Sequence, residues 1–407
     1  MIIRMYPQQP VRSHRWLRRF AYVLLVILLI GGVGVYNYVR PLPAATLAPG
    51  ALSTDINDAK VTWAPNMQAA VGAAGFGLLA THSSQSPMPI ASVAKVITAL
   101  TVLQKKPLAP GQTGPLIPLT ADDVARYDSY ASQGGAVARV VAGEQLNEYQ
   151  ALQIMLVGSA NNVADSLAVW AFGSMDAYVR AANAYVKQHH LPHTIVAADA
   201  SGFSPDTRST AEDLVALGIL AMQQPVVADI VAQPKVAVPL AGTIANVNPL
   251  LGQDGVVGIK TGSTENGGSA LLAGRITLAG QAVTIVAATV GSANIRQAIV
   301  DARTALDSAE QQFSVHTDVV AGQQFGTYQT AWGQASSVVA QTNVTIVAWN
   351  GTPLMPHVTI LPGQRANPKG AVVGSVIVQS AGNHGASPLI LQKAVAGPSF
   401  RWRLLRH

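Results

Sequence analysis

Three short motifs in this chain combine a candidate nucleophile with groups that could activate it. They are Ser92-Val93-Ala94-Lys95, Ser159-Ala160-Asn161 and Lys260-Thr261-Gly262, in that order. A serine hydroxyl is a weak nucleophile until a base removes its proton. Because Ser92 and Lys95 are three residues apart, a helix would place them on one face, one turn apart. Burial and the nearby charge of Lys260 would lower the pKa of Lys95, so that its amine could accept the proton.

The second motif could serve the leaving group. Ser159 could pass a proton to a departing amine, and Asn161 could hydrogen-bond both the substrate amide and Lys95. Taken singly, Ser159 would more often be a helix cap, and Ser92 with Lys95 would be a cap and a solvated helix residue. The three motifs in a fixed order, at spacings that fit one domain, are far more specific. Together they predict an enzyme that works through a covalent acyl intermediate.

The third motif could bind the substrate. Lys260 and Thr261 are expected on an edge strand beside the site, although Lys-Thr-Gly alone would be an ordinary strand end. Gly262 would let a peptide approach that edge in an extended conformation. The backbone N–H of Ser263, with that of Ser92 at the start of a helix, would form an oxyanion hole.

The motifs and their neighbours resemble the D-alanyl-D-alanine carboxypeptidases, which are low-molecular-weight penicillin-binding proteins. The similarity covers about residues 65–312 and is carried by four segments: Pro89–Leu100, Leu156–Asn162, Ser209–Asp213 and Gly258–Thr264. The resemblance implies a serine peptidase that removes the terminal D-Ala from peptidoglycan stem pentapeptides through an acyl-enzyme on Ser92. It also implies inhibition by β-lactams, and no metal or other cofactor is expected.

The resemblance extends to a carboxylate-binding group and shows two departures. Arg296 falls where the family places an arginine that holds the substrate carboxylate, together with Lys260 and Thr261. The family usually has an aspartate where this chain has Asn162. Many members are anchored by a C-terminal amphipathic helix, whereas the basic and aromatic segment 400–406 is shorter than such a helix.

Hydrophobic periodicity predicts the elements that position these motifs. Helices are expected over residues 93–103, 147–171, 175–189, 210–223 and 295–313, and strands over 267–276 and 283–290, joined by a turn at 278–281. This order predicts an α+β domain in which helices inserted between strands pack on an antiparallel sheet. The resemblance implies the fold of serine β-lactamases and DD-peptidases. Alternating runs from about residue 314, with 369–374 similar to the family's C-terminal domain, predict a small β-rich domain.

The N-terminal region predicts a membrane anchor. Phe20–Val39 contains no charged residue and is long enough to span a bilayer as a helix. Arginines precede this run, so its N-terminal side is expected in the cytoplasm and the rest of the chain outside it, at the cell membrane. A cleaved signal peptide, processed near Pro43–Ala45, is the alternative. The expected divisions are a basic tail and anchor over 1–40, a linker over 41–60, a catalytic domain over 61–313, a β-rich domain over 314–400 and a basic tail over 401–407.

Charge and cysteine content agree with this location. Residues 1–40 carry six arginines and no acidic residue, so they account for the whole formal charge of +6. The remaining chain is balanced, which argues against a nucleic-acid partner and places the basic ends next to anionic lipid. The chain has no cysteine, so neither disulfides nor thiol chemistry contribute.

Three other functions fit the residues less well. A class A β-lactamase would need a Glu-x-x-Leu-Asn element after Ser159, and the nearest match, Glu144–Asn147, precedes it. A metal site at His189, His190 and His193 is less favoured because histidines at a helix end more often cap carbonyls. A non-catalytic wall-binding protein would be favoured if a motif lysine or serine were missing. Endopeptidase and transpeptidase activity remain open, because both use the same acyl-enzyme.

Overall fold

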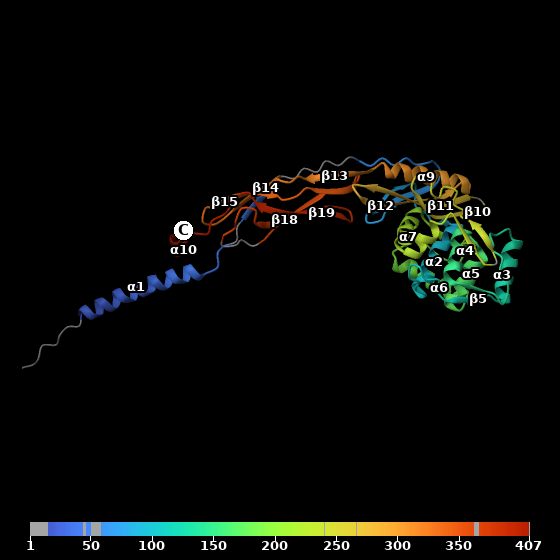
Figure 1. Cartoon of the computed structure of the whole chain (residues 1–407), viewed down its shortest axis with the longest axis horizontal. Helices are drawn as coiled ribbons and strands as arrows, with labels where there is room; N and C mark the ends of the chain where they lie inside the picture. Colours follow the sequence, from blue (N-terminus) through green and yellow to red (C-terminus); the bar gives the residue numbers. More distant parts are fainter. Residues whose placement is uncertain are drawn as a thin grey trace, which may run out of the picture.

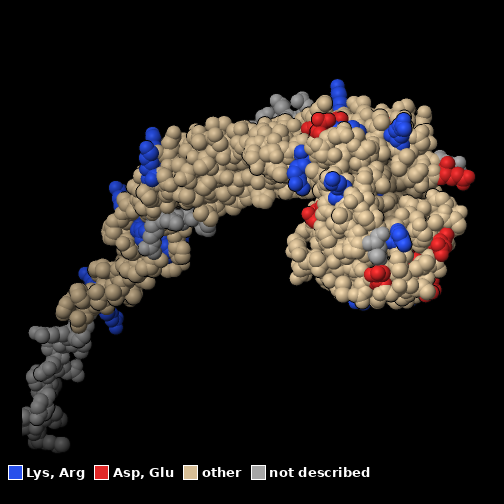
Figure 2. All heavy atoms as spheres, turned by 45° about the vertical axis from the view of Figure 1, so that its right-hand side comes forward, with Lys and Arg blue, Asp and Glu red and all other residues tan. Residues whose placement is uncertain are grey.

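The protein is elongated, with three parts in a row. The structure is a computed structural model, and it describes residues 15–43, 46–49, 58–239, 241–265, 267–361 and 366–406. A long N-terminal helix lies at one end, a β-rich region lies in the middle and a mixed helix-and-sheet domain lies at the other end (Figure 1). Charged side chains are sparse on the surface shown in Figure 2, in keeping with a charged fraction of 11%.

A five-stranded antiparallel sheet forms the centre of the mixed domain. Its order is β10 (Val256–Thr264), β11 (Gly267–Leu278), β12 (Gln281–Ser292), β2 (Gln68–Ala73) and β3 (Gly77–His82). The sequence thus returns to the sheet after a long helical excursion between β3 and β10. β10 lies at the edge, as predicted for the strand that carries the third motif. The predicted α+β architecture is confirmed.

Both faces of the sheet are buried, because the strands are apolar at successive positions. Alternate side chains of a strand point to opposite faces. Leu272 packs with helix α9 (Ile295–Glu310) on one face, whereas Leu271 and Ala273 join the larger core of the inserted helices on the other. Helix α7 (Ala211–Gln223) contacts β2 and β12 directly on this second face.

The inserted region is helical, with short two-stranded pairs between its helices. Its helices are η1 (Ala91–Val93), α2 (Ala94–Lys105), α3 (Ala121–Ser132), α4 (Glu148–Val157), α5 (Asn161–Phe172), α6 (Met175–Gln188), α7 and α8 (Pro225–Val231). Its strands pair as β4 (Met88–Pro89) with β7 (Arg208–Ser209), β5 (Leu116–Pro118) with β6 (Gln145–Asn147), and β8 (Lys235–Val238) with β9 (Gly242–Ala245).

The structure differs from the predicted helices in one place that matters for the site. The single helix predicted over 147–171 is two helices, α4 and α5, separated at Gly158–Ala160. Ser159 has a φ of +62°, a left-handed conformation that cannot continue a right-handed helix. The second motif therefore lies at a break between helices. Helices α3 and α8 were not predicted.

The β-rich region follows α9. Strands β14 (Gln324–Gln329), β15 (Ala335–Ala340), β17 (Met355–Ile360), β18 (Val372–Ser380) and β19 (Asn383–Leu391) form one sheet, and β13 (Phe313–Val319) pairs with β16 (Val344–Trp349). The segment predicted as a linker adds a sixth strand, β1 (Thr46–Pro49), which pairs with β14 at the edge. Residues 44–45 and 50–57 of that segment lie outside the described residues.

Helix α1 (Arg15–Val39) has no buried residue. Within the described residues it is the one unbroken helix that is long and apolar enough to cross a membrane, and an 18-residue window of it has a mean hydropathy of 2.1. The predicted apolar run Phe20–Val39 lies inside it, whereas the basic residues before position 15 lie outside the described residues. A short helix, α10 (Phe400–Leu405), packs beside the C-terminal end of α1.

Candidate active site

The three motifs converge on one cavity of about 750 Å³ between the helical region and the edge strand β10. Its lining includes Ser92 from η1, Ser159 and Asn161 from the α4–α5 break, and Thr261 and Ser263 from β10. The two motif lysines are not on this lining. Lys95 is 0% exposed and Lys260 is 1% exposed. The cavity therefore presents hydroxyl and amide groups, with two amines directly beneath them.

Lys95 connects the first two motifs. Its Nζ lies 2.8 Å from Ser92 Oγ and 2.7 Å from Asn161 Oδ1, and it donates to the backbone oxygen of Ser201 at 3.0 Å. A neutral amine has two N–H donors and one lone pair. Asn161 Oδ1 and Ser201 O can only accept, so they take both donors. The lone pair is then left for the hydroxyl proton of Ser92.

The electrostatics favour this neutral amine. Burial lowers the pKa of Lys95 well below 10.5, and the nearby charge of Lys260 lowers it further, against the opposing charges of Asp199 and Asp165. Burial also lowers the pKa of Lys260, to about 7. An amine that is uncharged near neutral pH can accept a proton.

The break between α4 and α5 directs the second motif into the cavity. The left-handed backbone of Ser159 turns the chain, and Asn161 then begins α5 with its N–H donated to Ala136 O at 2.8 Å. Asn161 Nδ2 lies close to Gly135, where an added Cβ would be 2.9 Å away. The loop that follows α3 is therefore packed tightly against Asn161.

Asn162, which replaces the expected aspartate, fastens that same segment. The side chain is fully buried. Its Oδ1 accepts from Ala138 N at 3.0 Å, and its Nδ2 donates to Ala138 O at 2.9 Å. A carboxylate could accept the first hydrogen bond but could not donate the second. An amide therefore satisfies both backbone groups.

Strand β10 lies in close contact with η1. A Cβ on Gly262 would lie 2.5 Å from Ile90 O and 3.1 Å from Ser92 N, so only glycine fits at this distance. The hydroxyl of Thr261 is buried on the cavity wall and has no hydrogen-bond partner among the described residues. Buried hydroxyls are normally paired, so this one is available to a ligand.

A carboxylate network behind the cavity was not predicted. Asp199 accepts hydrogen bonds from Ser201 N at 2.7 Å and Ser204 N at 2.8 Å. Asp165 accepts from Ala200 N at 2.9 Å and from the Tyr130 hydroxyl at 2.7 Å, and burial raises its pKa to about 6. Together they fix the loop whose carbonyl receives Lys95. The contacts of Asp199 are local, whereas Asp165 on α5 reaches Tyr130 and Ala200, each 35 positions away, and no spacing in the sequence marks those pairs.

The structure does not bring every predicted residue to the cavity. Arg296 is exposed near the start of α9, and its neighbour Ile295 lines the cavity instead. His189, His190 and His193 follow α6 and do not gather with other ligating side chains. Within the described residues there is no group of three or more His, Cys, Asp or Glu side chains that could hold a metal ion.

Comparisons with known proteins agree on the kind of enzyme that this chain resembles. The sequence profile of the Peptidase S11 family, described as D-alanyl-D-alanine carboxypeptidase, matches residues 68–291. A D-alanyl-D-alanine endopeptidase of Pseudomonas aeruginosa is 29% identical over 185 residues, which are 46% of this chain and 51% of that relative. The chain thus matches about half the length of this curated relative.

Solved structures share the fold. Penicillin binding protein 5 from Haemophilus influenzae aligns with a TM-score of 0.58 and 17% identity, over 84% of this chain and all of that one. The Streptomyces K15 DD-transpeptidase aligns with a TM-score of 0.52 and 19% identity, over 62% of this chain and 98% of the other. The first of these alignments includes the β-rich region, and at such identities both show the fold alone.

Proposed function

The chain belongs to the Peptidase S11 family of D-alanyl-D-alanine carboxypeptidases and is therefore a serine-type DD-peptidase. We propose that it removes the terminal D-alanine of peptidoglycan stem peptides. Ser92 is the proposed nucleophile and Lys95 the proposed base. The observation that carries this assignment is the set of three contacts of the Lys95 amine, which leaves one lone pair facing the hydroxyl of Ser92.

In the acylation step, Ser92 Oγ attacks the carbonyl of the penultimate D-alanine while Lys95 takes its proton. The backbone N–H groups of Ser92 and Ser263 stabilise the oxyanion that forms. The proton passes through Ser159 to the amine of the departing D-alanine, and Asn161 holds the substrate amide. Water then releases the shortened peptide from Ser92 and restores the free enzyme.

The substrate carboxylate is proposed to bind at the third motif. The buried Thr261 hydroxyl lacks a partner, and Lys260 supplies positive charge beside it when protonated. A charge-assisted contact of this kind fixes the end of the peptide. Arg296 stays a candidate third member of this group, approaching from the exposed side of α9.

The test is covalent labelling followed by product analysis. Full-length protein in detergent should take up one labelled penicillin per chain, located by mass spectrometry on the peptide that contains Ser92. The variant Ser92→Ala should take up none. Label retained at full yield by Ser92→Ala would refute the assignment, and absence of label on the wild type would favour a non-catalytic wall-binding protein.

Endopeptidase action is the second candidate, because the Pseudomonas relative carries that name. The two activities share the acyl-enzyme and differ in the group that leaves. A stem pentapeptide ending in D-Ala-D-Ala and a cross-linked muropeptide dimer, given to the same preparation, separate them. Free D-alanine from the pentapeptide supports the carboxypeptidase, whereas conversion of the dimer to monomers without D-alanine release supports the endopeptidase.

We further propose that α1 anchors the protein in the cell membrane with its N-terminus in the cytoplasm. The helix is unburied and apolar from Phe20 onward, and Arg15, Arg18 and Arg19 lie in its N-terminal turns. Alkaline phosphatase fused after Gly50 should be active, and a cytoplasmic reporter at the same place should not. A mature chain that begins near Ala45 would show that the helix is a cleaved signal.

A further inference from the structure

The two ends of the described chain meet beside α1. The C-terminal helix α10 lies along the last turns of α1, and Asn37 Nδ2 donates to Leu404 O at 2.9 Å. The Tyr38 and Phe400 rings lie 5.9 Å apart, and the Arg403 guanidinium lies 5.1 Å from the centre of the Tyr38 ring. The short helix α10, which could not anchor the protein alone, is thus attached to the apolar helix α1.

Arg406 holds this junction together. Its guanidinium donates to Asn37 O at 2.9 and 2.8 Å and to Pro41 O at 3.2 Å, and it also contacts Arg40 O. The last carbonyls of a helix have no partner within the helix. Arg406 therefore satisfies the exposed end of α1 and fixes α10 against it.

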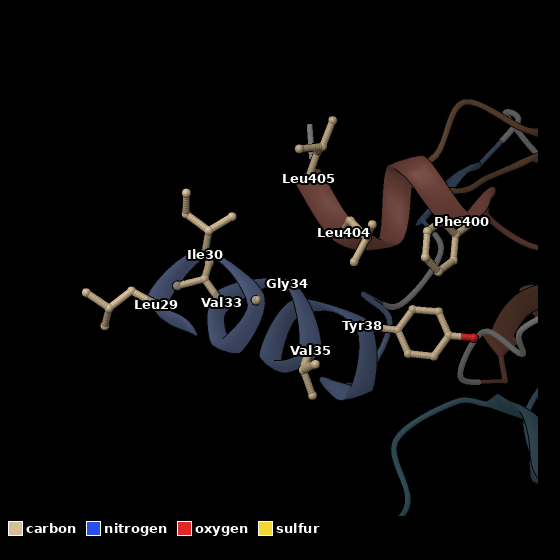
Figure 3. A pocket seen from close by; sticks show the side chains of 10 residues that line it. Leu29, Ile30, Val33, Gly34, Val35, Tyr38, Phe400, Leu404 and Leu405 are labelled. Atoms are coloured by element: carbon tan, nitrogen blue, oxygen red, sulfur yellow. The ribbon is translucent and has the colours of Figure 1, made fainter. Parts of the chain in front are cut away.

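Between the two helices lies an apolar groove of about 720 Å³. Its walls run from Leu29 to Tyr38 on α1 and include Phe400, Leu404 and Leu405 on α10, as Figure 3 shows. None of the lining residues is charged. The ten helical residues from Leu29 to Tyr38 rise roughly 14 Å, about half of a bilayer's hydrocarbon core. The α1 wall of the groove is therefore about as long as a single leaflet, and the six-residue α10 borders part of it.

The mouth of the groove is strongly positive. Arg40, Arg403 and Arg406 lie at the junction, and Arg401 is exposed on the same short helix α10. None of these four arginines forms a salt bridge among the described residues. Residues 15–43 and 366–406 contain no aspartate or glutamate. Desolvation, and then the charges of Arg40 and Arg403, lower the pKa of Arg406. An anion at this point would relieve the repulsion between these arginines.

We propose that the α1–α10 groove binds an anionic phospholipid of the outer leaflet, with an acyl chain between the helices and the phosphate on Arg401 and Arg403. This inference rests on the proposed insertion of α1 in the membrane. A second copy of α1 fits the groove less well, because it would bring Arg40 against the same arginines with no acidic residue to offset them. The charge at the mouth and the apolar walls below it match the two parts of such a lipid.

Trp402 lies on α10 between Arg401 and Arg403, with its ring 5.7 Å from that of Trp332, so it is close to the proposed phosphate site. Quenching of Trp402 by brominated lipids tests that site. Full-length Trp16→Phe protein is placed in nanodiscs that contain either brominated phosphatidylglycerol or brominated phosphatidylcholine, and Trp16→Phe/Trp402→Phe protein supplies the background. The glycerol lipid should quench Trp402 more strongly. Arg401→Gln/Arg403→Gln should reduce this preference by at least about fivefold, the factor expected for one arginine beside an anionic lipid surface. Arg180→Gln/Lys187→Gln removes the same charge from exposed positions on α6 and should leave the preference unchanged.

The remaining outcomes contradict the proposal in different ways. Equal quenching by both lipids would show that the groove holds bulk lipid without headgroup selection. Efficient disulfide cross-linking between two Gly34→Cys chains, without quenching, would show that a second copy fills it. Extraction of the protein from membranes by alkaline carbonate would overturn both the anchor and the groove. An inserted protein without lipid preference would overturn the groove alone.

Discussion

Replacing Lys95 with methionine isolates the proposed base. Methionine has a similar length but cannot accept a proton, so the acylation of Ser92 should slow by about 10²–10⁴-fold, the usual contribution of a general base. The side chain is fully buried, and its loss leaves Asn161 Oδ1 and Ser201 O without their donor. Each unpaired acceptor costs about 1–3 kcal/mol. Removal of a buried amine offsets part of this cost, so the variant should stay folded.

The assay is the second-order rate of acylation by a fluorescent penicillin, with urea unfolding measured on the same samples. Lys105→Met is the matched control, because Lys105 is an exposed lysine at the end of the same helix α2. It should acylate like the wild type. Lys95→Arg should fail nearly as badly as Lys95→Met, because a guanidinium cannot accept a proton at neutral pH. Acylation of folded Lys95→Met within tenfold of the wild-type rate would show that another group is the base.

Three further predictions follow from the same site. The pKa of Lys260 is about 7 when folded and close to 10.5 when unfolded, so the unfolded chain binds more protons between these values. The free energy of unfolding should therefore rise from pH 7 to 10, and Lys260→Met should flatten this rise in urea titrations. Gly262→Ala would place a Cβ 2.5 Å from Ile90 O, so it should destabilise the protein by about 1–3 kcal/mol in thermal unfolding and slow penicillin labelling at least tenfold; unchanged labelling would show that β10 moves freely. Arg296→Ala should lower kcat/KM for peptides with a free carboxylate by up to about fivefold relative to their amides, because an exposed ion pair contributes about 1 kcal/mol or less; equal effects on both would place Arg296 outside the site.

The sequence predicted the strands of the sheet because they depend on local pattern, and it predicted the edge position of the third motif because a bound peptide needs an accessible strand. The strands of the mixed domain are long and apolar, and β10 follows directly from Val256, where the pattern changes. The short helix α8 was missed because its seven residues are too few to show periodicity. β1 was missed because its four residues are ordered by pairing with β14, more than 270 positions away.

The sequence predicted the motif residues of the site but not the groups that hold them in place. Ser92 and Lys95 are three residues apart, so their contact follows from helix geometry. Ser201, the third partner of the Lys95 amine, contributes a backbone oxygen, and a backbone oxygen has no signature in the sequence. Asp199 accepts from Ser201 within its own loop, whereas Asp165 accepts from the backbone N–H of Ala200, 35 positions away. Contacts of this kind depend on tertiary packing and become visible only in the folded chain.

Three of the ten non-glycine residues that have a left-handed backbone in the described part of the chain lie around the reactive amine. Ala91, Ser159 and Ala198 all have a left-handed backbone, with φ of +47°, +62° and +60°. Each such residue costs about 1–3 kcal/mol and persists only where the surroundings hold it. Ala91 directly precedes Ser92, and Ala198 directly precedes Asp199.

The surroundings that hold this strain are the core of the helical region. Val93, Ile97 and Leu156 belong to one buried apolar cluster that continues into the sheet. Gly202 packs so closely that an added Cβ would lie 2.1 Å from Ala91 O. Packing of this core therefore offsets the cost of the strained backbone, and it keeps Ser92, Lys95 and Asn161 within hydrogen-bond distance before any substrate binds. Such preorganisation lets the proposed proton transfer begin without rearrangement of the site.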